Sequence, residues 1–136
     1  RVLFRSKNLE GMATATASAK ITSDKIGELN ELSSLFHEAK NAGDITKMLQ
    51  ANYQFRFKIY AYAEMPTLMT MIEQLWVRAG PSFHYLYSNS IEPFQHINVY
   101  QPLLSALEKK EPSASHLAIC QIIDESATFL QQQYHH

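Results

Sequence analysis

The chain has 136 residues, which fits one domain, and its 46% hydrophobic and 18% charged residues exclude a disordered segment and a membrane-embedded protein. Twelve basic against thirteen acidic residues give a formal net charge of −1, which excludes nucleic-acid binding through a strongly positive surface. The one cysteine, Cys120, cannot form an internal disulfide, so we expect a protein of the reducing cytoplasm.

Apolar residues recur at helical spacing along the chain, and only four glycines and five prolines interrupt them. We therefore expect an all-α fold, an antiparallel bundle of six or seven helices. The first helix is expected over about residues 2–17. Thr22 is the expected N-cap of the second helix, which should end near Gly43 because glycine readily follows a helix C-terminus.

Asp44 is the expected N-cap of a third helix that runs to about Ala63. Pro66 suits the first turn of a fourth helix. Gly80 and Pro81 should break or kink that helix, because proline removes one backbone hydrogen bond and its ring crowds the preceding turn.

The last two predicted helices begin at Ser90 and Pro112. The first of them should carry Tyr100 and Leu104 on its inner face, and the second should carry Leu117 there. An inward tyrosine is more often part of the core than a ligand contact, although its hydroxyl still needs a hydrogen-bond partner.

A polar pair breaks the apolar pattern of the third helix. Asn52 and Arg56 lie four residues apart on its inner face, so both should point into the bundle. A guanidinium stays charged, and burying it requires an anion or several acceptors. The expected partner is a carboxylate such as Glu31 or Glu73, or an acidic ligand. An Arg56 that reaches the rim or forms an internal ion pair is an equal alternative.

Motifs that encode catalysis are missing from the sequence. We find no glycine-rich phosphate loop, no nucleophile elbow and no metal-ligand spacing among the six histidines. A small helical enzyme would need a nucleophile beside a base, and nothing in the sequence pairs Cys120 with a histidine. We therefore expect no enzyme activity and no cofactor.

Four segments together resemble a known family. Residues 9–13, 52–60, 65–76 and 103–107 are similar, in order and spacing, to the C-terminal effector domain of FadR-like regulators of the GntR type. The resemblance implies that residues 1–136 form an all-helical effector-binding and dimerisation domain. It implies a small-molecule effector such as a carboxylate, a homodimer, and DNA binding only through an N-terminal winged-helix domain. Because the chain starts at Arg1 without a methionine, we interpret it as a fragment that lacks that domain.

Many members of that family hold a divalent metal ion on one aspartate and three histidines. The matching positions here are Asn52, Arg56, Tyr100 and Ile122, so we predict no metal at this location. We expect Arg56 to supply the positive charge instead, with Asn52 and Tyr100 orienting an anionic effector and Arg78 assisting. The alternative is a helical protein-interaction module whose core is filled by side chains and which binds no effector.

Overall fold

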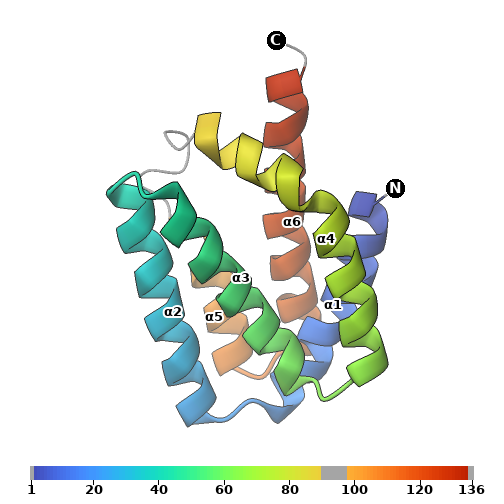
Figure 1. Ribbon diagram of the computed structural model, residues 1–136. Coiled ribbons are helices and arrows are strands. Elements are labelled where there is room, and N and C mark those ends of the chain that lie inside the picture. Colours follow the sequence, from blue (N-terminus) through green and yellow to red (C-terminus); the bar gives the residue numbers. More distant parts are fainter. Residues whose placement is uncertain (1, 90–97, 135–136) are drawn as a thin grey trace.

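The computed structural model describes the backbone of residues 2–89 and 98–134 and the side chains of residues 4–78 and 98–124. These residues form six helices and no strand, and consecutive helices run in alternating directions (Figure 1). The predicted all-α antiparallel bundle is therefore confirmed. The helices are α1 (Val2–Lys20), α2 (Ser23–Asn41), α3 (Ile45–Tyr62), α4 (Pro66–Asn89), α5 (Gln101–Glu108) and α6 (Pro112–Tyr134).

The predicted cap residues set the start of α2 and α3. The Thr22 hydroxyl accepts the Lys25 amide hydrogen at 3.4 Å, and the Asp44 carboxylate accepts the Lys47 amide hydrogen at 3.1 Å. Gly43 follows α2 with φ +73°, a left-handed conformation that glycine adopts without steric strain. These three predictions are confirmed, and so are the prolines at the start of α4 and α6.

Several predicted boundaries and one inward position were wrong. Helix α1 continues to Lys20. Helix α4 runs through residues 80–81 to Asn89 with a change in axis direction (Figure 1), so of the predicted break or kink the structure shows the kink. A proline inside a helix is accommodated by such a bend. The predicted start at Ser90 lies outside the described residues, and α5 begins at Gln101, so Tyr100 precedes that helix. Leu117 is 69% exposed.

The core lies where α1 packs against α6 and α2 against α3, with α5 behind them (Figure 1). Phe55 and Tyr100 stack at its centre, with ring centroids 4.0 Å apart. Each fully buried large apolar side chain contributes about 1.5–3 kcal/mol by leaving water. Besides these two rings, the largest fully buried side chains are Tyr60, Ile21, Leu29, Met48, Ile59, Ile72, Leu103, Leu107 and Ile119.

Two lysines hold the turns together at one end of the bundle. The Lys20 ammonium donates to the carbonyl of Ala63 at 3.1 Å, which joins the end of α1 to the turn after α3. The Lys110 ammonium donates to the carbonyl of Ile21, which joins the turn after α5 to the turn before α2. Chain segments far apart in sequence are thereby fixed to one another at this end.

Two glycines in helices provide a matched test of packing. A Cβ at Gly11 of α1 would lie 2.5 Å from His116 Cε1 of α6, whereas a Cβ at Gly27 of α2 would meet nothing within 4 Å. We expect Gly27→Ala to raise the free energy of unfolding by about 0.5–1 kcal/mol through helix propensity. We expect Gly11→Ala to lower it by about 1–3 kcal/mol through overpacking.

Urea denaturation of both variants measures these changes. Combining Gly11→Ala with His116→Ala should remove the steric cost, since the imidazole is the group in the way. Equal stabilisation by the two single substitutions would show that His116 moves aside without cost.

Candidate functional site

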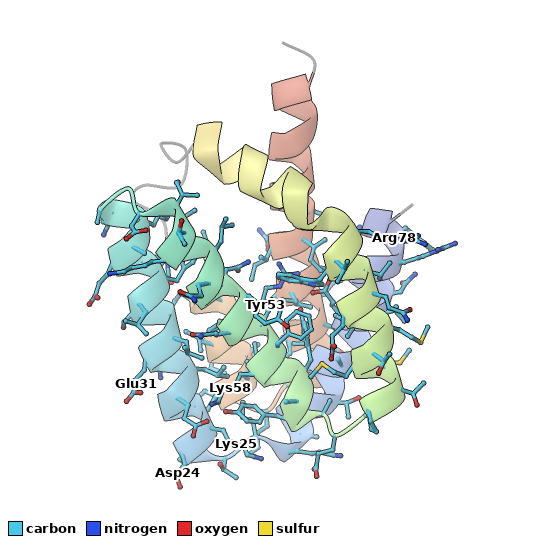
Figure 2. The ribbon with its side chains drawn as sticks, in the orientation of Figure 1. Asp24, Lys25, Glu31, Tyr53, Lys58 and Arg78 are labelled. Atoms are coloured by element: carbon cyan, nitrogen blue, oxygen red, sulfur yellow. The ribbon has the colours of Figure 1, made fainter. Side chains whose placement is uncertain are left out.

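Arg56 is buried in the bundle and ion-paired with a carboxylate of another helix. It is 2% exposed, Glu10 of α1 is 1% exposed, and Arg56 Nη2 lies 2.6 Å from Glu10 Oε1. The partners predicted from the sequence were wrong. Glu31 and Glu73 are both exposed, and Glu31 points away from the bundle (Figure 2).

A single oxygen of Glu10 receives three hydrogen bonds. Besides Arg56, the Tyr60 hydroxyl donates to Oε1 at 2.5 Å and the Trp76 indole N–H donates at 3.1 Å. The Arg56 guanidinium also lies over the Trp76 ring, 4.6 Å from its centroid. One carboxylate therefore connects α1 to α3 and α4 through charged and neutral donors.

The protonation states of this cluster follow from burial and charge. Burial alone lowers the pKa of Arg56, but the Glu10 carboxylate and the phenol groups of Tyr60 and Tyr100 offset this and raise the pKa above its usual value. Burial raises the pKa of Tyr60 well above its usual value. Arg56 therefore stays charged, and Tyr60 stays protonated as a donor.

Asn52 and Tyr100 form a second buried contact one helical turn away. Asn52 is 4% and Tyr100 1% exposed, and the Tyr100 hydroxyl donates to Asn52 Oδ1. Asn52, Arg56 and Tyr100 therefore share one region of the interior. Arg78 does not join them, because it is exposed in a surface groove that also includes Arg5 and it points away from the bundle (Figure 2).

Helix α2 adds polar groups to this interior that the sequence analysis did not single out. His37 lies edge-on to Tyr100, with ring centroids 6.0 Å apart, and its Nδ1 lies 2.7 Å from the carbonyl oxygen of Ser33. Lys40, one turn further along α2, is 2% exposed. The pKa of His37 is lowered, first by burial and then by the charge of Lys40, against the raising effect of the Ser33 carbonyl.

The lowered pKa of His37 predicts a loss of stability in acid. As the pH falls below the ordinary value of 6.5, the unfolded chain binds a proton that the folded chain resists, so the free energy of unfolding decreases. We expect the parent to lose more stability than His37→Phe between about pH 8 and about pH 5.5. Urea denaturation at both pH values measures this, and equal losses would exclude a His37 that resists protonation in the folded chain.

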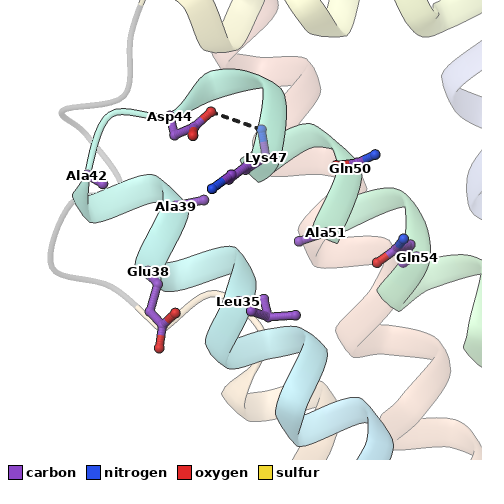
Figure 3. A pocket seen from close by; sticks show the side chains of 9 residues that line it. All are labelled: Leu35, Glu38, Ala39, Ala42, Asp44, Lys47, Gln50, Ala51 and Gln54. Carbon is purple, nitrogen blue, oxygen red and sulfur yellow. Dashed lines mark hydrogen bonds between the residues drawn. The ribbon is translucent and has the colours of Figure 1, made fainter.

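A surface groove of about 430 Å³ lies at the turn between α2 and α3 (Figure 3). Its lining includes Leu35 and Glu38 of α2 and Lys47 and Gln54 of α3. None of the four predicted ligand contacts lines this groove.

Comparison with known protein families identifies the domain. The family model of the FCD domain matches residues 6–125. The chain belongs to the FCD domain family. It is 40% identical over 128 residues to the HTH-type transcriptional regulator McbR of Escherichia coli strain K12, a member of the GntR family. That match covers 93% of this chain and 58% of the relative, so the chain spans less than two thirds of McbR.

A solved structure of the FCD family has the same fold. The structure of E. coli McbR/YncC superimposes with a TM-score of 0.92 at 36% sequence identity, covering 98% of this chain and 67% of that one. The predicted resemblance to the effector domain of GntR-type regulators is therefore confirmed. Within the described helices, none is long and apolar enough to cross a membrane.

The metal position of many FCD domains does not suit a metal ion here. Asn52 Oδ1 already accepts from Tyr100, Arg56 is a cation paired with Glu10, and Ile122 offers no donor atom. Across the described part of the chain, no group of three or more His, Cys, Asp or Glu side chains is arranged to hold a metal ion. A divalent ion also prefers anionic or neutral donors to a guanidinium.

Proposed function

We propose that residues 1–136 are the ligand-sensing and dimerisation domain of a cytoplasmic bacterial transcription regulator and have no enzyme activity. A small anionic metabolite, such as a carboxylate, would change DNA binding by a winged-helix domain of the longer protein. Support comes from membership of the FCD family and from the 40% identity to McbR, an HTH-type transcriptional regulator. The ligand acts by binding two states of the domain with different affinity.

The observation that carries this proposal is the buried polar region inside an otherwise apolar bundle. Asn52, Arg56 and Tyr100 are each at most 4% exposed and lie in one part of the interior. Small-molecule sites are mostly apolar with a few well-placed polar groups, and this combination fits them. The assignment of Asn52, Arg56, Arg78 and Tyr100 as ligand contacts remains a prediction.

Calorimetric titration of this chain with a panel of small mono- and dicarboxylates tests the proposal. We expect at least one acid to bind, and Asn52→Ala to weaken it by about 10-fold through loss of a buried hydrogen bond. Arg78→Ala tests the exposed arginine in the same titration. If no acid in the panel binds, the proposal of a small anionic effector is wrong.

We also propose that the domain forms a homodimer, because two DNA-reading heads on a two-fold symmetric operator need a two-fold symmetric protein. Sedimentation equilibrium should give twice the chain mass of 15.6 kDa. A single-chain mass at about 100 μM, a concentration at which even weak dimers associate, would contradict this part of the proposal.

A second candidate function is a helical interaction module with a filled core. The internal neutralisation of Arg56 by Glu10 favours it, because the arginine charge then needs no ligand. Under this alternative, no metabolite in the calorimetric panel would bind.

A further inference from the structure

We propose that a second copy of this chain docks on the outward side of α1, with the two α1 helices antiparallel across a two-fold axis. This inference rests on the proposed homodimer and assigns its surface and the orientation of the two copies. We name the surface the α1 face. It comprises the outward side of α1 and the parts of α4 and α6 that adjoin it, with Phe4, Met12, Ala15, Met71, Val77, Arg78 and Leu117.

Exposed apolar side chains gather on the α1 face. Among the described residues, seven large apolar side chains are exposed, and five of these belong to α1, α4 and α6. Two grooves flank α1: Leu9 lines one together with Met71 and Val77 of α4, and Ala15 lines the other together with Leu117 of α6. Contiguous apolar surface of this kind is typical of a contact with another protein surface.

The outward side of α1 also lacks charge over more than three turns. Glu10 is the one charged residue between Asn8 and Ala19, and it is buried. The exposed and half-buried positions of this stretch carry Asn8, Leu9, Met12, Ala15, Thr16 and Ala19. A helix that faces water normally carries charged residues on its outward side, whereas the centre of a protein interface is depleted in them. We therefore infer that α1 is covered in the assembled protein.

The size of the α1 face fits a second copy. Helix α1 has 19 residues, so it is about 28 Å long, and with α4 and α6 on either side the face is about 30 Å wide. The resulting area of about 800 Å² per copy is what a stable interface buries on each partner. A two-fold axis pairs identical surfaces, so a second copy offers a face of equal size and polarity.

The register of α1 against α4 locates the middle of the α1 face. At one end, Lys20 Nζ of α1 lies 3.6 Å from Glu64 Oε1 in the turn before α4. At the other end, Arg5 and Arg78 line one groove, and Arg78 points outward near the first turns of α1 (Figure 2). The two helices are therefore antiparallel, and Met12, midway between Arg5 and Lys20, lies near the middle.

The orientation of the second copy follows from the charges on the α4 side. Met71 lies level with Met12, and Arg78 and Glu64 each lie seven residues from Met71, in opposite directions. A two-fold axis through the middle of the face, at right angles to α1, places Arg78 of one copy opposite Glu64 of the other. A parallel arrangement would instead bring the Arg5 side chains of the two copies together, and like charges across an interface repel each other.

A charge placed beside the axis tests the inference by sedimentation equilibrium of the whole chain. We expect Met12→Glu to weaken dimerisation by at least about 100-fold, because the interface would bury two carboxylates next to each other. Leu35→Glu on α2 is the matched control, since Leu35 is 53% exposed and Met12 is 49% exposed. It should dimerise as the parent does.

Charge exchange tests the antiparallel orientation. Arg78→Glu and Glu64→Arg should each weaken dimerisation by about 10-fold, because each opposes like charges across the interface. The double variant restores an opposite pair and should recover most of the loss. A double variant that dimerises more weakly than either single variant would overturn the orientation.

Disulfide trapping covers the case in which Met12→Glu does not fold. In a Cys120→Ala background, Met12→Cys should join two copies on mild oxidation, because a residue beside the axis lies close to its own copy. Leu35→Cys should remain a single chain under the same conditions. Equal cross-linking of the two variants would overturn the inference.

The outcomes separate this inference from the function on which it rests. If the parent is a dimer and Met12→Glu dimerises as tightly, the α1 face is not the interface, and the proposed homodimer stands. If the parent sediments as a single chain at about 100 μM, both the homodimer and this inference are overturned. The calorimetric titration with carboxylates tests the ligand-sensing function independently of either result.

Discussion

Replacing Glu10 with leucine, or Arg56 with methionine, is expected to lower the free energy of unfolding by about 3–5 kcal/mol. Each substitution leaves a charged group, or the hydrogen-bond donors of the missing carboxylate, buried without a partner. Burying an unpaired group costs far more free energy than burying the matched ion pair. The double variant Glu10→Leu with Arg56→Met removes both charges and should be less destabilised than the sum of the single changes. Urea denaturation of the three variants yields the coupling energy.

The matched control is an ion pair at the surface. Lys7 and Asp124 lie 3.0 Å apart, but their side chains are 35% and 48% exposed. Lys7→Met should change stability by less than about 1 kcal/mol, because water screens such pairs. Additive effects of the Glu10 and Arg56 substitutions would contradict this prediction, because they would show that the two side chains do not stabilise each other.

Truncating Tyr100 to alanine should cost about 3–5 kcal/mol, because its ring is 1% exposed and stacks on Phe55 at 4.0 Å. Tyr100→Phe keeps the ring but removes the donor to Asn52, and leaving that amide oxygen unsatisfied should cost about 1–3 kcal/mol. Thermal or urea unfolding separates the two contributions.

A second substitution checks the cause assigned to the Tyr100→Phe effect. Adding Asn52→Leu to Tyr100→Phe replaces both polar partners with apolar ones and should recover part of the loss. A Tyr100→Phe variant as stable as the parent would mean that the hydroxyl contributes nothing to folding.

The helices were predictable because local signals determine where they start and end. Thr22, Asp44, Pro66 and Pro112 act within one helical turn, so the sequence around each of them is sufficient. Gly80 and Pro81 predicted a break or a kink, and α4 changes direction without breaking, as a helix with an internal proline can do.

The site was only partly predictable. Helical periodicity correctly placed Asn52 and Arg56 inside, but the partner of Arg56 lies 46 residues earlier, on another helix. A signal for Glu10 did exist, because it shares its face of α1 with the buried Ala13 and Ala17 and is the charged residue on that face.

His37 and Lys40 were missed for a different physical reason. Basic residues near a helix C-terminus are commonly solvent-exposed and favoured there by the helix dipole, so their position in α2 did not suggest burial. Only the packing of α2 against the Tyr100 region reveals that they face inward.

The lysine contacts hold the turns at one end of the bundle more firmly than those at the other end. Lys20 and Lys110 tie three turns together through backbone carbonyls at one end, whereas His37 and Lys40 lie toward the opposite end of α2. Amide hydrogens near Ile21 and Ala63 should exchange slowly, while local opening should be concentrated near the α2–α3 turn. A small molecule would thus enter and leave through the α2–α3 end, while the contacts of Lys20 and Lys110 keep the helices in register at the other end.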